Sequence, residues 1–224
     1  MPKSLIGDVL SRIRSQVKAV KTDSLLTDRV IYSFVLKHAK FLLRREDAKN
    51  KIMSMTSVVQ ALPVVELEEV DKVEACCVGI SSNCKIKRTK DKLPTFLEGY
   101  YGPLIRTVMS VDGSEELQPT LPSSYLVMAG SKNFRFNKTK YFWFMNDYIY
   151  FPNLEWDTVR IEGIFEEDIS AFTCEPDHCI DKIAQPFNVP DYLYSELETN
   201  VVKDLLGLYN MPADHMIDKE NPSR

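Results

Sequence analysis

Residues 57–165 impose the strongest constraint on the fold, because short apolar segments follow one another there with no helical periodicity between them. These segments are rich in valine, leucine and aromatic residues, a composition typical of strands. Parallel strands need long crossover connections, so the short connections predict antiparallel pairing in a β-sandwich or barrel-like domain. Pro63 cannot donate to a sheet ladder and should separate the first two strands. The predicted strands are residues 57–62, 64–70, 93–98, 104–111, 124–129, 133–137, 141–145, 148–151 and 158–165.

Polar residues mark the connections within this β region. Asn146 and Asp147 predict a two-residue hairpin turn. Residues 137–139, Asn-Lys-Thr, predict a second turn, between the strands 133–137 and 141–145. Two longer polar segments, residues 84–92 and 112–122, are expected to be either plain solvent loops or exposed lobes that reach a neighbouring molecule.

Helical periodicity dominates the N-terminal part of the chain. One helix is predicted for residues 4–20, where apolar residues recur every three or four positions. A second is predicted for residues 28–50, with Thr27 as its N-cap, and the two should form a hairpin. The predicted buried residues are Leu5, Val9, Ile13, Val17 and Val20 in the first helix and Ile31, Phe34, Val35, Phe41 and Leu42 in the second.

The chain ends with a third predicted helix and a polar tail. Pro190 suits a first helical position, and an apolar stripe runs from there to about residue 209. Residues 210–224 lack periodicity and are expected to be extended. The predicted fold class is therefore α+β. Its parts are an N-terminal helical region (1–55), an antiparallel β domain (56–185), a C-terminal helix (186–209) and an extended tail (210–224).

Composition narrows the class of protein. A hydrophobic content of 44% over 224 residues can form a real core. No run of about 18 apolar residues is available to cross a bilayer, so no membrane partner is expected and the protein should be cytosolic when made. Residues 1–51 contain 12 Lys/Arg and 5 Asp/Glu, a charge of +7, which leaves −11 for the rest. Opposite surfaces are therefore expected to meet different partners.

Motifs for catalysis are missing from the sequence. No glycine-rich phosphate loop and no G-x-S-x-G turn are present. The three histidines, His38, His178 and His215, stand in a basic helix, a cysteine-flanked loop and the tail, so no nucleophile with its base can be proposed. We therefore expect a protein that is not an enzyme and has no cofactor.

The cysteines offer one weak candidate metal site. Cys174, His178 and Cys179 are soft ligands at close spacing, and with Cys76, Cys77 or Cys84 they could complete a zinc site. However, no second matching knuckle follows, and adjacent cysteines on a strand point to opposite faces. Small buried residues and a solvated turn are the preferred interpretation, and an odd number of cysteines argues against a disulfide framework.

A basic face on the second helix is the main candidate interaction surface. Lys37, Lys40, Arg44 and Arg45 could contact phosphates, which would make the chain a nucleic-acid-binding accessory protein. Because no recognition motif accompanies them, a solvated face or a docking surface for an acidic protein is favoured. The aromatic run at 141–151 could likewise stack on bases, but its period of two favours core or interface packing.

Four phrases in order resemble a known family. They are the helix at residues 28–47, the strand VRIEGIFEED at 159–168, the segment FNVPDYL at 187–193, and the ending MPADHMIDKEN at 211–221. Together they resemble the ring or adaptor structural proteins of crAss-like phages, which connect portal and tail in podovirus-type particles. The resemblance covers nearly the whole chain.

This resemblance implies a virion structural protein in the head–tail connector. The chain would form a closed ring of about twelve copies with heterologous interfaces. Its partners would be the portal protein, the adjacent connector or tail rings, and the genomic DNA that passes through the channel during packaging and ejection. The protein would be found in the virion, and in the host cytoplasm during assembly. Candidate interface residues are the four basic residues of the second helix with Pro212, Asp214 and His215.

Overall fold

The protein forms two compact units in a computed structural model. One unit comprises residues 1–52 with 176–224, and the other comprises residues 53–175. The first is helical and the second is mainly β structure, so the α+β prediction is confirmed. The structure describes residues 5–20, 26–49, 52, 55–71, 73, 85–131, 134, 137–166, 169 and 187–209.

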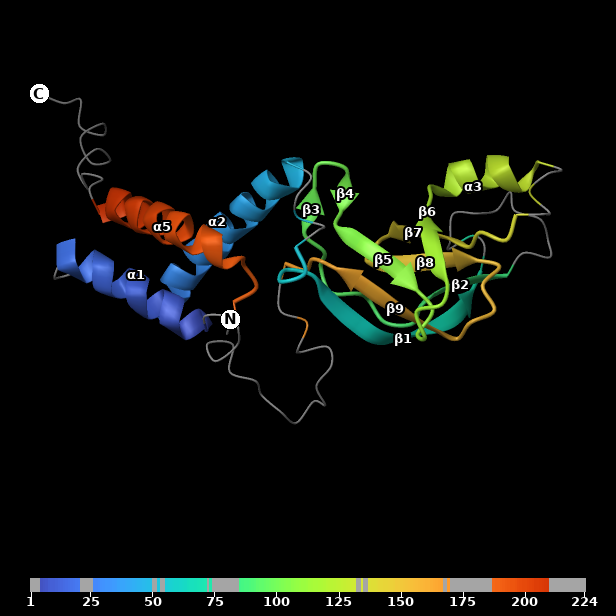
Figure 1. The fold of residues 1–224 in the computed structure, drawn as a ribbon, viewed down its shortest axis with the longest axis horizontal. Helices are drawn as coiled ribbons and strands as arrows, with labels where there is room; N and C mark the ends of the chain where they lie inside the picture. The colour runs from blue at the N-terminus through green and yellow to red at the C-terminus, as the bar shows by residue number, and fades with distance from the viewer. Residues whose placement is uncertain are drawn as a thin grey trace, which may run out of the picture. The chain divides into compact units, whose positions relative to one another are not determined.

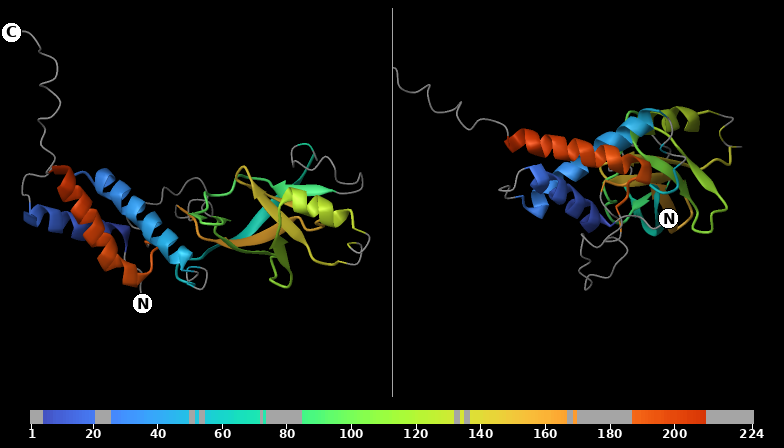
Figure 2. Two further views of the ribbon diagram at one scale, coloured as in Figure 1. Left: turned by 90° about the horizontal axis from the view of Figure 1, so that it is seen from above. Right: turned by 60° about the vertical axis from the view of Figure 1, so that its left-hand side comes forward.

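The helical unit combines segments from both ends of the chain. Its elements are α1 (Ile6–Val20), α2 (Asp28–Ala48), a short 3₁₀ turn η4 (Asp191–Leu193) and α5 (Tyr194–Tyr209). The C-terminal helix α5 packs against both N-terminal helices, as Figures 1 and 2 show. The predicted helical hairpin is therefore completed by a third helix. The shared core contains Val9, Ile13, Val17, Ile31, Val35, Leu42, Leu193, Leu197, Val201 and Leu205.

The buried face of α2 differs from the prediction at several positions. Ile31, Val35 and Leu42 are buried as expected, whereas Phe41 is 61% exposed. Ala39, Leu43 and Glu46 are also buried although the prediction omitted them, and Phe34 is only partly buried. Since each residue turns the helix by about 100°, a side chain next to a buried one can point well away from the core. Phe41 therefore lies on the outer surface of α2.

A closed seven-stranded barrel forms the β unit, in the order β1-β2-β8-β7-β6-β5-β9. A separate two-stranded hairpin, β3–β4, and one helix, α3, complete it (Figure 1). The barrel strands are β1 (Gln60–Val70), β2 (Ile86–Thr89), β5 (Ile105–Met109), β6 (Glu116–Pro119), β7 (Tyr141–Met145), β8 (Tyr148–Pro152) and β9 (Thr158–Gly163). The other elements are β3 (Glu98–Gly99), β4 (Gly102–Pro103) and α3 (Pro122–Ala129).

Two predictions for the β unit were wrong, one about the type of an element and one about the direction of strand pairing. Residues 124–129 form part of the helix α3 and not a strand. The strands on either side of α3, β6 and β7, pair in parallel, with Gln118 opposite Tyr141. A parallel pair requires a crossover, and α3 belongs to that crossover. A short apolar run such as Tyr-Leu-Val-Met does not distinguish a helix from a strand by periodicity, which explains the error.

Further strand assignments changed. Of the predicted strand 93–98, only Glu98 lies in a strand, at the start of β3. The polar segments 84–92 and 112–122 contain β2 and β6 and are not merely loops. Residues 60–70 form one strand despite Pro63, because the pairing register of β1 with β9 shifts between Leu62 and Val65. Such a bulge tolerates a residue that cannot donate. The predicted strand 133–137 lies mostly outside the described residues.

The β7–β8 hairpin was predicted correctly. Met145 pairs with Tyr148 across the two-residue turn, and Asn146 and Asp147 have φ of 54° and 66°. These positive values are typical of a type I′ turn, which Asn and Asp tolerate better than most residues. Trp143 of this hairpin and the α3 residue Tyr125 belong to a second cluster on the outside of the barrel.

Candidate interaction surfaces

The four candidate basic residues of α2 fall into two groups, and those of the first group pair with acidic residues of α5. Arg45 donates both terminal guanidinium nitrogens to Glu196 of α5, with 2.7 Å between Nη2 and Oε2. Lys37 Nζ and His38 Nε2 lie 3.3 Å and 2.9 Å from Asp204 Oδ2, also on α5. These contacts join α2 to the C-terminal helix.

The ion pairs lower the pKa of the carboxyl groups on α5. The hydrogen bond from Arg45 lowers the pKa of Glu196, and the hydrogen bond from His38 lowers that of Asp204. A third pair, Arg12 of α1 with Glu198 at 2.8 Å, joins α5 to the other helix. The acidic side chains of α5 are therefore matched to cations on both partner helices.

Glu46 forms a buried polar group beside this interface. It accepts hydrogen bonds from Lys49 Nζ at 2.8 Å and from the Tyr192 hydroxyl at 3.1 Å. The bond from Lys49 is the main reason that its pKa is lowered, and burial of the Tyr192 hydroxyl beside Glu46 raises the pKa of that phenol. Since Tyr192 precedes α5, this network fixes the start of the C-terminal helix against the end of α2.

The second group lies on the outer surface of α2. Arg44 is exposed and Lys40 is partly exposed, and the exposed ring of Phe41 lies between them in sequence. We call Lys40, Phe41 and Arg44 the outer α2 surface. It combines positive charge with one aromatic ring, a composition suited to a protein partner with acidic and apolar groups.

The net charge of the helical unit is smaller than the +7 of residues 1–51, because the unit also contains the C-terminal part of the chain. Residues 176–224 contain 4 Lys/Arg and 9 Asp/Glu, so the helical unit has a net charge of only +2. The β unit contains 12 Lys/Arg and 18 Asp/Glu, a net charge of −6. Much of the positive charge that the sequence offers for phosphate contact is thus matched by acidic residues of the same unit.

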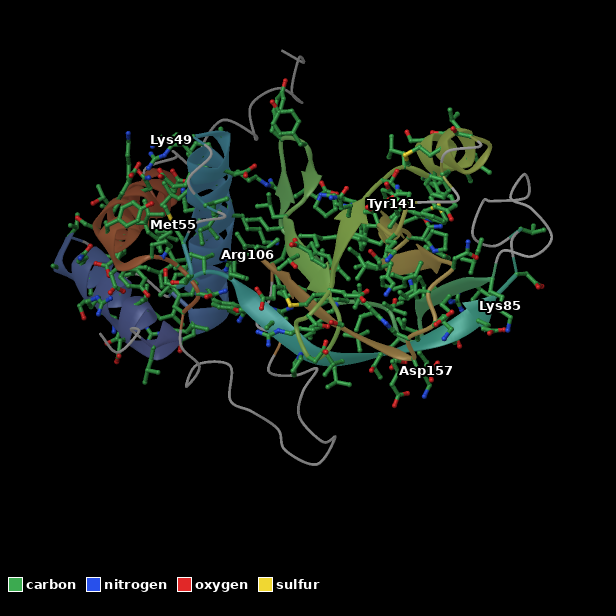
Figure 3. The ribbon with its side chains drawn as sticks, turned by 45° about the vertical axis from the view of Figure 1, so that its right-hand side comes forward. Lys49, Met55, Lys85, Arg106, Tyr141 and Asp157 are labelled. Atoms are coloured by element: carbon green, nitrogen blue, oxygen red, sulfur yellow. The ribbon has the colours of Figure 1, made fainter. Side chains whose placement is uncertain are left out.

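The β unit has a polar hollow of about 420 Å³ beside the ends of β1, β2 and β8. Lys87 lines it and is 8% exposed, and its ammonium donates to the carbonyl oxygens of Glu155 and Trp156 and to Asp157 Oδ1 at 2.8–3.2 Å. These three hydrogen bonds from Lys87 hold the segment that leads into β9. Figure 3 shows Lys85 and Asp157 at this end of the unit. The hollow is lined by Glu69, Lys85, Lys87, Asn153, Leu154 and Glu155.

The β3–β4 hairpin presents two tyrosines that sequence reasoning missed. Tyr100 and Tyr101 occupy its tip, and they are 84% and 93% exposed. Glycines flank the pair, in the sequence Glu-Gly-Tyr-Tyr-Gly-Pro at residues 98–103. Two glycines around an aromatic pair are typical of a hairpin tip. The strand prediction for this region did not use this signal.

The family model for phage tail ring protein 2, a family named after the crAss phages, matches residues 5–221. The chain belongs to this family. A search of curated proteins found no match. The resemblance inferred from the four phrases is therefore confirmed. The family description gives this ring protein a structural role in the phage tail and places it in the virion.

The predicted interface residues in the tail and the predicted zinc ligands are not tested by the structure. Pro212, Asp214 and His215 lie outside the described residues, and so do the cysteines and His178 of the possible zinc site. Among the residues that the structure describes, no three potential ligands are grouped to hold a metal ion. Within the same described part, no helix has the length and apolar character needed to cross a membrane.

Proposed function

We propose that the chain forms the adaptor ring between portal and tail in the head–tail connector, with a channel through which the genome passes. The separation of charge between the two units is the observation that carries this proposal. The β unit, at −6, would repel DNA phosphates and suit the wall of a channel that must not grip its cargo. The outer α2 surface would bind the portal.

The proposal includes about twelve copies in a closed ring, a number taken from the family resemblance. Adjacent connector or tail rings would contact the remaining faces. Nothing in this role requires turnover of a substrate, and the described polar clusters are accounted for by packing between helices and strands. Lys87 and Glu46, for example, have enough partners to be satisfied structural groups.

Reversal of charge on the outer α2 surface should weaken docking to the portal. We expect Lys40→Glu with Arg44→Glu to reduce affinity for purified portal by about ten-fold or more, because two favourable charges become repulsive. Arg45 must stay intact in this experiment, since it holds Glu196. Binding would be measured by sedimentation of the mixture.

A matched control separates local charge from net charge. Lys18 and Lys203 are exposed on α1 and α5, so Lys18→Glu with Lys203→Glu changes the total charge equally at other places. This control should bind portal as the wild type does. Wild-type affinity of the Lys40/Arg44 variant, with helical content unchanged by circular dichroism, would contradict the assignment of the outer α2 surface.

Removal of the tail tests a second part of the proposal. We propose that residues 210–224, including Pro212 and Asp214, lie across the next subunit of the ring. Deletion of this segment should weaken ring closure while both units stay folded, because it leaves every described core residue, from Ile6 to Leu205, in place. Light scattering would measure ring formation. Rings of wild-type size and stability from the truncated protein would refute this role.

A further inference from the structure

We infer that the Tyr100–Tyr101 tip of the β3–β4 hairpin inserts into the polar hollow of a second copy of this chain. This inference rests on the ring assembly proposed above and names the contact that would close the ring. It depends on a rigid protrusion at one end of the β unit and a receiving surface at the other.

The base of the hairpin is firmly anchored in the barrel. Leu97 and Leu104, immediately outside β3 and β4, are buried, and the Leu104 amide donates to the Leu97 carbonyl at 2.9 Å. Both residues also hydrogen-bond to the backbone of Ile164, at 2.8 Å and 3.0 Å. Phe96 stacks on Phe165 with 4.6 Å between ring centroids. The tip therefore projects from a fixed base.

The tip itself has a defined conformation. The rings of Tyr100 and Tyr101 meet edge to face, 5.0 Å apart at 84°. Gly102 has a φ of +119°, which side-chain-bearing residues rarely adopt. Tyrosines are enriched at the centres of interfaces, since each ring covers much area at a small cost in conformational entropy. Two adjacent, preorganised and almost fully exposed tyrosines are an anchor for a partner.

The hollow at the other end has the chemistry to accept them. Glu69 and Glu155 can accept hydrogen bonds from the phenol hydroxyls, and the ammonium of Lys85, which pairs with Glu69 at 3.0 Å, can lie over an aromatic face. Its volume of about 420 Å³ lies within the range of small-molecule pockets, so an aromatic side chain fits. Tyrosine, with an apolar ring and a polar end, matches such a mixed lining.

A second copy is the occupant that the arrangement favours. A cyclic ring uses heterologous interfaces, in which two different surfaces of the same subunit meet. The hairpin and the hollow belong to one compact unit and lie at its opposite ends, as the β3–β4 hairpin in Figure 1 and Lys85 in Figure 3 show. Because the barrel fixes their separation, each subunit can give its tip to one neighbour and receive the tip of the other.

Mixing two defective variants tests this directly. The tip variant is Tyr100→Ala with Tyr101→Ala, and the hollow variant is Glu69→Arg with Glu155→Arg, all at exposed side chains. Each variant alone should lose self-association by about ten-fold or more in dissociation constant. An equimolar mixture should form heterodimers but no larger species, because only one intact tip meets one intact hollow. Analytical ultracentrifugation of the full chain would measure this.

Each outcome decides a different claim. Wild-type rings together with normal association of either variant would overturn the tip-to-hollow contact and leave the ring proposal standing. Variants that stay monomeric even when mixed would also overturn it, since the two surfaces would then not meet. A wild-type protein that is monomeric at every concentration would contradict the ring proposal itself. Val127→Ser, at a 79% exposed position on α3, is the control and should associate normally.

Discussion

Gly163→Ala should destabilise the β unit by about 1–3 kcal/mol, the usual cost of forcing extra atoms into a packed site. A Cβ at this position would lie 2.8 Å from Cε1 of Phe96 and 2.9 Å from the Leu104 carbonyl oxygen. The second contact is with backbone, which cannot turn away as a flexible side chain can. Gly163 ends β9, where the hairpin base meets the barrel, so the substitution should also disturb the tyrosine tip.

Gly207→Ala is the matched control for this prediction. Apart from the local helix backbone and the two neighbouring residues, no atom lies within 4 Å of a Cβ built on Gly207, and the residue is exposed in α5. Alanine should therefore be neutral or stabilise the helical unit by about 0.5–1 kcal/mol. Both tryptophans, Trp143 and Trp156, belong to the β unit, so urea unfolding followed by tryptophan fluorescence reports on that unit. Equal midpoints for Gly163→Ala and the wild type would refute the steric argument.

The helices were predictable because each contributes one buried stripe to a single core. Periodicity identified Val9, Ile13 and Val17 in α1, and all three are fully buried. It was wrong for Leu5 and Val20 at the two ends of this stripe, which are 41% and 69% exposed. It could not show that α5 returns to cover α1 and α2, because this contact is between residues far apart in sequence. The position of Phe41 illustrates the limit, since an apolar residue beside a buried stripe need not belong to it.

The β unit was harder to predict, since its strands depend on partners for their stability. β2 contains Lys87 and Arg88 and reads as a loop, yet each cation has acceptors nearby that make a strand favourable there. By contrast, the Asn146–Asp147 turn was predictable because the local backbone demands those residue types. Local chemistry was visible in the sequence, whereas pairing across the barrel was not.

Contacts between residues far apart in sequence also decide the role of the basic residues on α2. Four basic residues on one helix looked equivalent, but Arg45 and Lys37 are engaged by acidic residues more than 150 positions away. Only the fold shows which of these cations pair with the acidic residues of α5. The tyrosine tip was missed for a related reason, since exposure at a hairpin end depends on the short pairing of β3 with β4.

Acid should unfold the helical unit before the β unit. Glu46, Glu196 and Asp204 all have a lowered pKa in the folded protein. A carboxyl group with a depressed folded-state pKa contributes stability above its unfolded value of about 4, and this contribution is lost as pH falls through the folded value. The β unit also has carboxyl groups with a lowered pKa, Glu66, Asp112 and Asp157, but all three are exposed, so solvent screens their interactions. In the helical unit Glu46 is buried, and Glu196 and Asp204 are partly buried.

Two probes separate the units in an acid titration of the full chain. The circular dichroism signal of the helices should decline below about pH 4, ahead of the tryptophan fluorescence change. Arg45→Gln should move the helical transition to higher pH, because Glu196 loses the donor that lowers its pKa and the helical unit starts from lower stability. Lys18→Gln, at an exposed position on α1, should move neither transition. Coincident transitions in both probes, unaffected by Arg45→Gln, would show that the contacts with α5 do not hold the helical unit together.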